Sequence, residues 1–151
     1  MQDGKKELEE KCREAKEASR KLAFLDTETK NKALLNISRA LLTNQKEILA
    51  ANELDYKDSE ASGMSMAMLD RLMLSQSRLE TIAQDVKTVA ALPDPAGEII
   101  EQCVLPNGLR LIKKRVPLGV IGSIYESRPN VTIDISALCL KAGNAVILRG
   151  G

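Results

Sequence analysis

The chain has 151 residues, with 22 Lys and Arg against 21 Asp and Glu and no histidine, so its formal net charge is +1. This balance gives no overall positive field that would attract nucleic acid or an anionic membrane. Aromatic residues make up only 2% of the chain, which predicts an aliphatic core and little base stacking with single strands. Without histidine, this chain cannot itself form a Ser-His-Asp triad, a Cys-His pair or a histidine-ligated zinc site.

The three cysteines, Cys12, Cys103 and Cys139, are far apart, odd in number and never in a C-x-x-C spacing. This pattern indicates neither a disulfide framework nor a zinc knuckle. The N-terminus is charged throughout, and no apolar run has the length of a bilayer span. We therefore expect a cytoplasmic protein with no membrane association.

Up to about Leu92 the chain has the spacing of amphipathic helices. Apolar and small residues recur every three or four positions, at Leu8, Cys12, Ala15, Ser19 and Leu22 and again at Leu34, Ile37 and Leu41. Thr27 and Asn44 are candidate N-caps, and Glu47 lies where it would complete a capping box with Asn44. A series of helices is predicted for this part of the chain.

A further helix is predicted to begin at Ser75, because serine is a favoured N-cap residue. Its buried face is defined by five residues at helical spacing: Leu79, Ile82, Ala83, Val86 and Ala90. Pro93 and Pro95 end it. From Glu98 onward the composition changes to β-branched runs separated by glycine and proline, so the second part of the chain is predicted to be α/β.

Residues 99–116 contain two β-prone runs, IIEQCVL and LRLIKKRV, on either side of Pro106-Asn107-Gly108. Asn-Gly between such runs is a strong hairpin signal, so these residues are predicted to form a two-stranded ribbon. A lone hairpin is marginally stable in water. We therefore expect the ribbon to lie against another sheet or another subunit.

Residues 119–125, GVIGSIY, are predicted to form a short, fully buried strand. Glu126-Ser127-Arg128-Pro129 follows, and an apolar helix is expected from about Asn130 to Ala142, with Pro129 in its first turn. Gly143-Asn144 supplies a left-handed exit from this helix, and residues 145–149 are predicted to form a second buried strand. Together these elements make a right-handed βαβ unit with parallel strands.

The βαβ unit points to a ligand, because small molecules bind beyond the carboxyl ends of parallel strands. The helix start near Asn130 favours an anion, and Arg128 adds a cation that can bind phosphate or carboxylate. No G-x-G-x-x-G is present, so the residues alone predict only an anion or nucleotide site. Arg149 ends the second strand where an NAD-selective site more often has an acid, which favours the 2′-phosphate of NADP if the ligand is a dinucleotide.

The segment VPLGVIGSIYESRPNVT, residues 116–132, and the final KAGNAVILRGG closely resemble the gamma-glutamyl phosphate reductase (glutamate-5-semialdehyde dehydrogenase) family. The likeness extends upstream through TKNKALLNISRALLTNQKEILAAN, DRLML and DPAGEII, so it covers essentially the whole chain. This family is part of the aldehyde dehydrogenase superfamily, whose cofactor domain departs from the usual glycine fingerprint. The resemblance implies an α/β fold with N-terminal helices, the first βαβ unit of a Rossmann-like NADP-binding domain, and a β-hairpin arm.

The resemblance also implies an oxidoreductase that uses NADPH to reduce L-glutamyl 5-phosphate to L-glutamate 5-semialdehyde and phosphate, the second step of proline biosynthesis. In such enzymes a cysteine thiolate displaces phosphate to give a thioester, and hydride from the nicotinamide then releases the aldehyde. Implied partners are further copies of the chain in a homo-oligomer and glutamate 5-kinase. The family's chains are longer, and their nucleophilic cysteine is expected after the end of this chain, so all three cysteines here are expected to be structural.

By the same resemblance, the cofactor-contacting loop corresponds to Ile124, Tyr125, Glu126 and Ser127, and the adenosine side to Arg149, Gly150 and Gly151. Arg128 is the candidate for binding the substrate. Aligning on Pro129 puts Ser127 where many superfamily members carry an oxyanion asparagine, while Asn130 follows the proline. We favour Asn130 as the oxyanion donor, because an amide is the matching chemistry, with helix capping as its alternative role. No metal site is implied.

Three regions are expected: residues 1–98 as the helical part of the cofactor domain, 99–116 as an oligomerisation arm, and 117–151 as the start of the NADP-binding sheet. The alternative is a catalytically inactive fragment that serves only as a structural or assembly piece, because two parallel strands do not make a stable doubly wound sheet. A nucleic-acid-binding helical module is disfavoured by the charge of +1 and the few aromatic residues.

Overall fold

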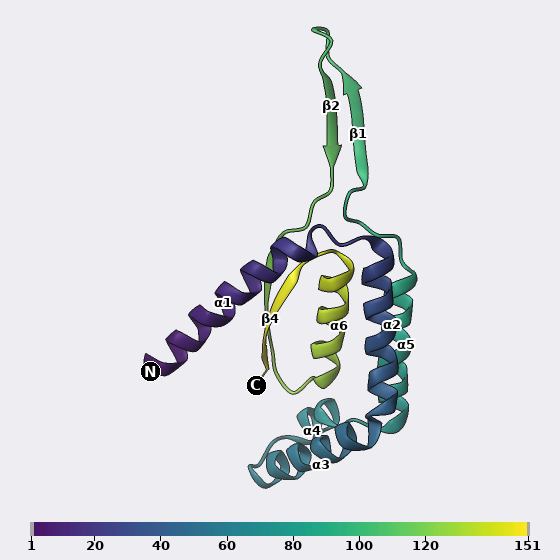
Figure 1. Ribbon diagram of the computed structural model, residues 1–151. Coiled ribbons are helices and arrows are strands. Elements are labelled where there is room, and N and C mark those ends of the chain that lie inside the picture. Colours follow the sequence, from purple (N-terminus) through teal and green to yellow (C-terminus); the bar gives the residue numbers. More distant parts are fainter. Residues whose placement is uncertain (1, 151) are drawn as a thin grey trace.

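The computed structural model of the chain describes residues 2–150, which have a mixed α/β fold (Figure 1). The helices are α1 (Gln2–Leu22), α2 (Thr27–Thr43), α3 (Gln45–Ala61), α4 (Met66–Leu72), α5 (Gln76–Ala91) and α6 (Pro129–Lys141). The strands are β1 (Ile99–Val104), β2 (Arg110–Lys114), β3 (Val120–Tyr125) and β4 (Ala145–Gly150). The predicted change from a helical first part to an α/β second part is confirmed.

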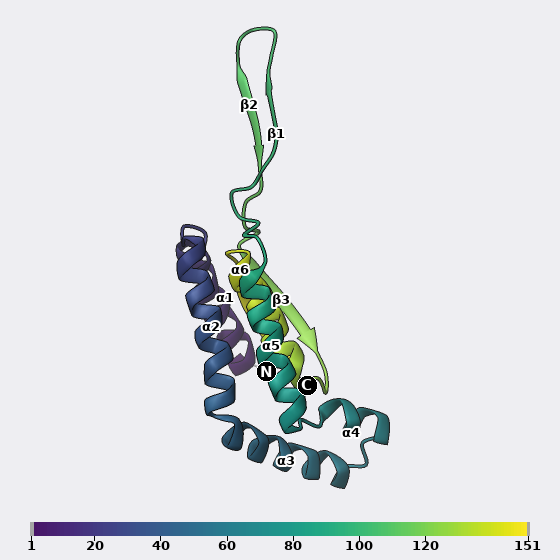
Figure 2. The ribbon, with the colours of Figure 1, turned by 90° about the vertical axis from the view of Figure 1, so that its right-hand side faces the viewer.

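The helices α2, α5 and α6 form the centre of the molecule. α2 and α5 lie side by side, and α6 packs against both of them (Figures 1 and 2). The parallel pair β3–β4 contacts α6 and also α1, while α3 and α4 lie at the end of the α2–α5 pair (Figure 1). The β1–β2 hairpin projects away from all of the helices (Figure 2).

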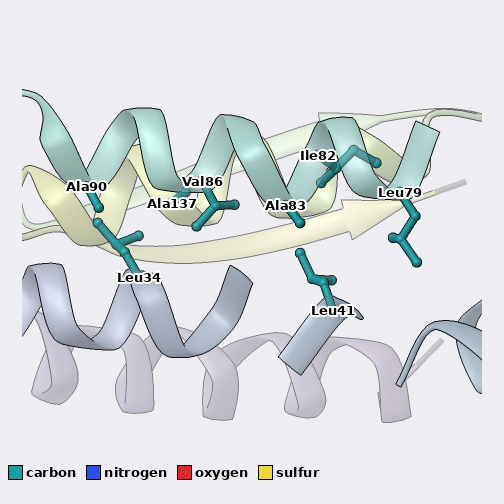
Figure 3. Close-up of a cluster of buried hydrophobic side chains, with 8 residues drawn as sticks. All are labelled: Leu34, Leu41, Leu79, Ile82, Ala83, Val86, Ala90 and Ala137. Atoms are coloured by element: carbon teal, nitrogen blue, oxygen red, sulfur yellow. The ribbon is translucent and has the colours of Figure 1, made fainter. Parts of the chain in front are cut away.

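The hydrophobic core lies between α2, α5 and α6 and is aliphatic, as the composition predicts (Figure 3). All five residues predicted for the buried face of the fifth helix are buried, and they pack with Leu34 and Leu41 of α2 and Ala137 of α6. Each fully buried leucine, isoleucine or valine contributes about 1.5–3 kcal/mol. This cluster holds α6 against α5, and the first residue of α6 comes shortly after the end of β3 in the chain.

A buried ion pair joins α2 to the segment that follows α5. The Lys30 Nζ lies 2.5 Å from the Asp94 Oδ2, and the two side chains are only 2% and 10% exposed. The Thr27 hydroxyl donates to the same oxygen at 2.7 Å, and the Ala96 N–H donates to Oδ1 at 3.0 Å. Burial alone would raise the pKa of Asp94, but these hydrogen bonds outweigh it and hold the pKa below its usual 3.8.

Lys141 is buried at the end of α6, next to this ion pair. Its Nζ donates to Asn31 Oδ1 at 2.6 Å and to the Ala90 carbonyl oxygen at 2.8 Å. Burial lowers the pKa of Lys141, and the charge of Asp94 opposes that shift. These bonds tie the C-terminal end of α6 to α2 and α5. Because α6 is a rigid helix, they also fix the position of its first turn.

The starts of α2 and α3 differ from the prediction. Asp26 rather than Thr27 is the N-cap of α2, because Asp26 has extended backbone angles and its carboxylate accepts a first-turn N–H at 2.7 Å. Asn44 precedes α3 but makes no N-cap bond, because its side chain donates backward to a carbonyl oxygen of α2 at 2.8 Å. The predicted capping box is therefore wrong. Ser75 caps α5 as predicted.

The β1–β2 ribbon is antiparallel as predicted, with Cys103 opposite Leu111. Its turn is a three-residue loop, and Gly108 supplies the left-handed position with a φ of 84°. Within residues 2–150 the ribbon is a two-stranded sheet of its own, so the expectation that it lies against another sheet is wrong for this part of the chain. Support by another subunit stays a prediction.

β3 and β4 pair in parallel as predicted, and the intervening helix α6 begins with Pro129 in its first turn. Neither strand is fully buried, which corrects the sequence prediction. Alternate residues of β3 are exposed, with Ile124 at 88%, because side chains alternate between the two faces of a strand and one face of β3 is not covered within residues 2–150. Leu8 and Cys12, on the predicted apolar face of α1, are likewise exposed.

Replacing Asp94 by asparagine should destabilise the helical centre by about 3–5 kcal/mol, because the charge of Lys30 then stays buried without its counter-ion. The free energy of opening is measured by hydrogen exchange at the amides of α2 and α6. Glu53→Gln is the matched control, because it breaks the exposed pair with Lys57 and should have no measurable effect.

The same comparison has a defined pH dependence. A carboxylate with a lowered folded-state pKa stabilises the fold above its unfolded pKa and loses that contribution as the pH falls through the folded value. The difference between the parent chain and Asp94→Asn should therefore be constant near neutral pH and shrink below about pH 3.8. A difference that grows on acidification would contradict this account of Asp94.

Candidate functional site

The carboxyl ends of β3 and β4 lie side by side at one edge of the molecule. Tyr125, the last residue of β3, is in register with Gly150 of β4. Its hydroxyl shares a hydrogen bond of 2.6 Å with the Thr132 hydroxyl of α6, which ties the strand end to the helix that follows. The predicted loop residues and Arg149 are therefore brought together at one edge.

Ser127 has a left-handed backbone, with a φ of 49°. Among residues 2–150, it is the one residue other than glycine with a positive φ. It is also buried, at 7% exposure, with its Oγ 4.0 Å from the sulfur of Met64 in the α3–α4 connection. Such a conformation costs about 1–3 kcal/mol and persists where surrounding contacts enforce it. Strain of this kind is concentrated at ligand sites, which supports the prediction for this loop.

The start of α6 carries no side-chain cap. Arg128 occupies the N-cap position, with a φ of −140° and a ψ of 81°, and its own side chain is exposed. Pro129 has no N–H, and the Val131 N–H donates to the Arg128 carbonyl oxygen at 3.1 Å, so the Asn130 N–H is the first-turn donor left at the positive end of the helix dipole, beside a guanidinium. This arrangement can bind phosphate or carboxylate.

Asn130 lies one residue further along, and it is exposed. Its Nδ2 donates to Asp134 Oδ2 at 3.0 Å. The side chain therefore does not cap α6, and the helix-capping alternative for Asn130 is wrong. An amide nitrogen has two hydrogens, so the second one can still donate to a developing oxyanion.

Asn130 borders a cavity of about 250 Å³ between α4, α5 and α6. The residues that line it are Arg71, Met73, Leu74, Arg78, Thr81, Ile82, Asp85, Pro129, Asn130 and Asp134. Burial raises the pKa of Asp134, the hydrogen bond from Asn130 lowers it, and the nearby charge of Asp85 raises it further. Two carboxylates thus face this cavity close to each other.

The other predicted site residues lie at the same edge. Ile124 and Glu126 are exposed, and so is Arg149, whose Nη1 donates to the Gly150 carbonyl oxygen at 2.7 Å. Gly151 lies outside the described residues. An exposed guanidinium at the end of β4 is accessible to an anion.

The three cysteines lie on α1, in the hairpin and in α6. Cys139 is buried in α6, and burial raises the pKa of its thiol, which disfavours the reactive thiolate. Cys103 lies in the hairpin, and Cys12 is exposed on α1. The expectation that Cys139 is structural is consistent with its burial.

Among residues 2–150, no group of three or more histidine, cysteine or acidic side chains is arranged to hold a metal ion. No helix in the same range combines the length and apolar character needed to cross a membrane.

Sequence reasoning missed the cavity that Asn130 borders. Asp85 follows Arg78 and Ile82 at helical spacing, and Asp134 follows Asn130 by one turn, so each helix by itself looks like an ordinary amphipathic helix with a solvated side. A signal was present in the acidic residue on the mostly apolar helix α6. Only the packing of α4, α5 and α6 brings these charges to one cavity.

Together, the fold and the site define a mixed α/β protein in which N-terminal helices lead into a βαβ unit with Arg128 and Arg149 exposed beside its strand ends, and a hairpin stands apart. No family model matches the chain. Over 145 residues, it is 61% identical to the gamma-glutamyl phosphate reductase of Dehalococcoides mccartyi and 57% identical to that of Caldanaerobacter subterraneus subsp. tengcongensis. Both alignments cover 96% of this chain, but 34% and 35% of the relatives.

Solved structures agree with the sequence match. The crystal structure of gamma-glutamyl phosphate reductase from Thermotoga maritima has a TM-score of 0.92 and 43% identity, covering 95% of this chain and 35% of that one. The Saccharomyces cerevisiae enzyme has a TM-score of 0.87 and 37% identity, covering 91% and 35%. The predicted resemblance is confirmed, because the chain matches the N-terminal third of gamma-glutamyl phosphate reductases in sequence and fold. It spans about a third of the length of these relatives.

The strained backbone at Ser127 can be tested with two substitutions that both remove its hydroxyl. Ser127→Val should be less stable than Ser127→Gly by about 1–2 kcal/mol, because a β-branched residue is disfavoured at positive φ and glycine is not. Thermal unfolding of the two variants measures this difference. In an ordinary strand valine is the better residue, so the opposite order would show that the loop is not left-handed.

Proposed function

We propose that this chain provides part of an NADP-dependent oxidoreductase of proline biosynthesis that reduces L-glutamyl 5-phosphate to L-glutamate 5-semialdehyde and phosphate. The observation that carries the proposal is the 61% identity to gamma-glutamyl phosphate reductase over 145 residues, or 96% of this chain. The edge described above supports it, because the residues implied by the resemblance lie together there. We propose the same division into residues 1–98, 99–116 and 117–151 as the sequence predicts.

The residues at the strand ends fit a dinucleotide phosphate. Backbone groups of Ile124, Tyr125, Glu126 and Ser127 would line the cofactor, and Ser127 supplies a left-handed turn in this loop where no glycine is present. Arg149, Gly150 and Gly151 would lie on the adenosine side, where an arginine can pair with a 2′-phosphate. NADPH supplies the hydride when it is bound.

Residues at the start of α6 would hold the acyl phosphate. Arg128 offers a cation for the phosphate, and the positive end of the α6 dipole offers the Asn130 N–H. Asn130 would donate its free amide hydrogen to the oxyanion, and its bond to Asp134 holds that amide in one orientation. The nucleophilic thiolate is not assigned to any cysteine of this chain.

The direct test is the reverse reaction, with the protein expressed from its whole coding sequence. L-glutamate 5-semialdehyde should reduce NADP⁺ only when phosphate is present, because phosphate is the group that releases the acyl intermediate. Reduction at the same rate with no phosphate would indicate an ordinary aldehyde dehydrogenase. No reduction at all would refute the proposal.

Arg149→Glu should reduce or reverse the preference for NADPH over NADH, because an acid repels the 2′-phosphate and accepts hydrogen bonds from a ribose hydroxyl. The ratio of kcat/KM for the two cofactors measures this preference. Arg149→Gln is the matched intermediate, since it removes the cation without adding a charge. An unchanged ratio in both variants would remove Arg149 from the cofactor site.

The hairpin of residues 99–116 should lie in an interface between subunits. Apolar side chains are exposed on both of its strands, including Ile100, Val104, Leu111 and Ile112, and the ribbon has no core of its own. Leu111→Asp should therefore lower the mass of the assembly measured by light scattering. Leu54→Asp on α3 is the control, because Leu54 is similarly exposed, at 64% against 56%. Equal masses for both variants and the parent protein would contradict a place for the hairpin in the subunit interface.

The 151-residue chain by itself should not catalyse the reaction. Cys139 is buried, Cys103 lies in the ribbon and Cys12 lies on α1, so none is placed to attack an acyl phosphate bound at the start of α6. The phosphate-dependent assay is run with the short chain and with the product of the whole coding sequence. Comparable turnover by the short chain, abolished by Cys103→Ala or Cys139→Ala, would show that the replaced cysteine is the nucleophile and contradict this prediction.

A further inference from the structure

The cavity between α4, α5 and α6 combines charges of both signs with an apolar floor. Asp85 of α5 and Asp134 of α6 contribute carboxylates, and Arg71 of α4 contributes a guanidinium. Leu74 and Ile82 supply apolar surface between them. A cavity of about 250 Å³ suits a small polar molecule rather than a protein segment.

The two carboxylates are not neutralised by the protein. Among residues 2–150, neither Asp85 nor Asp134 forms an ion pair, and the hydrogen bond that Asp134 receives comes from the neutral amide of Asn130. Burial and, to a smaller degree, the charge of Asp85 raise the pKa of Asp134, and a bound cation would favour its carboxylate form. A primary ammonium, with three donors, matches such a pair.

The two arginines of the cavity have different environments. Arg78 is already engaged, because its guanidinium donates to Asp70 Oδ1 at 2.9 Å and to the Asp70 and Met73 carbonyl oxygens at 2.5 and 2.8 Å. Arg71 forms no ion pair within the described residues. Arg71 is therefore the cation that remains for an anionic ligand group.

We propose that this cavity binds the amino-acid end of the substrate, with Asp85 and Asp134 receiving its α-ammonium and Arg71 its α-carboxylate. The inference rests on the proposed function and deepens it, because it assigns the residues that distinguish an α-amino acid from other aldehydes and acyl phosphates. Opposite charges that line one cavity without pairing with each other are complementary to a zwitterion. Asn130 borders the same cavity, which puts the acyl group beside its amide.

The bond between Asn130 and Asp134 couples the two ends of the substrate site. Asp134 is a positioning residue for the Asn130 amide, through the 3.0 Å hydrogen bond, and it is also proposed to contact the ammonium. Asp85 makes no such bond, so its substitution tests ammonium recognition without removing the acceptor of the Asn130 amide. A substrate without the ammonium would leave two carboxylates close together and uncompensated, which rejects it.

The first experiment uses the unaltered protein, expressed from its whole coding sequence, and three aldehydes in the phosphate-dependent reverse reaction. L-glutamate 5-semialdehyde carries both charged groups, 5-oxopentanoate lacks the ammonium, and 4-aminobutanal lacks the carboxylate. Each deletion should lower kcat/KM by about 10- to 100-fold, the value of a charge-assisted hydrogen bond. Equal kcat/KM for all three would overturn the inference.

The second experiment compares Asp85→Asn with Asp55→Asn, a control on the exposed surface of α3. Asp85→Asn should raise the KM for L-glutamate 5-semialdehyde about 10- to 100-fold, with little change in the KM for NADP⁺ or in kcat/KM for 5-oxopentanoate. Asp134→Ala should do the same and also lower kcat, because Asn130 loses its acceptor, whereas Asp134→Asn keeps an acceptor oxygen and should retain kcat. Arg71→Gln should weaken binding of the carboxylate. Its kcat/KM for L-glutamate 5-semialdehyde should therefore fall toward that for 4-aminobutanal, while its discrimination against 5-oxopentanoate is kept.

The outcomes separate this inference from the function on which it rests. Turnover of L-glutamate 5-semialdehyde with no loss of discrimination in Asp85→Asn and Arg71→Gln would overturn the assignment of the cavity and leave the proposed function standing. No phosphate-dependent turnover by the unaltered protein would overturn both. If Asp134→Ala does not fold, the exposed Asp85 and Arg71 variants still decide the matter.

Discussion

The buried ion pair between Lys30 and Asp94, with Lys141 beside it, is the constraint on which the arrangement of the helices depends. Lys30 has 2% exposure, so its charge is tolerable only where α2 meets the segment after α5 in this one register. Lys141 can satisfy its donors only when the end of α6 lies against the same junction. Such groups add little net stability compared with apolar residues, but they penalise every other packing of the three helices.

Fixing one end of α6 also fixes the other end, which lies next to the strand edge. The helix starts at Pro129, and the bond from Tyr125 to Thr132 holds the end of β3 against it. The chain between them turns through the left-handed Ser127, and the uncapped first turn of α6 faces outward as a result. The position of the strand edge thus depends on helix packing at the far end of α6, and the cavity bordered by Asn130 follows from the contact of α5 with α6.

Local patterns predicted most of the elements, because helical spacing, proline positions and Asn-Gly chemistry act within a few residues. The buried face of α5, the hairpin and the parallel pair were predicted from such signals. The exposure of β3 was not predicted, because it depends on neighbouring strands and helices that no local pattern specifies. Asp26 took the cap expected of Thr27, since both residues are good caps and the Thr27 hydroxyl is engaged by Asp94. The charged cavity needs three separate helices, so it could not be predicted from any one of them.

The central claim is that the carboxyl edge of β3 and β4 binds NADPH through this chain's own backbone and Arg149. Hydrogen exchange of the protein expressed from its whole coding sequence, with and without NADPH, tests it most directly. The account predicts that NADPH slows exchange at the amides of residues 125–131 and 149–150 and leaves those of the hairpin, residues 99–116, unchanged. Tight NADPH binding with unchanged exchange at residues 125–131 and 149–150 would contradict it.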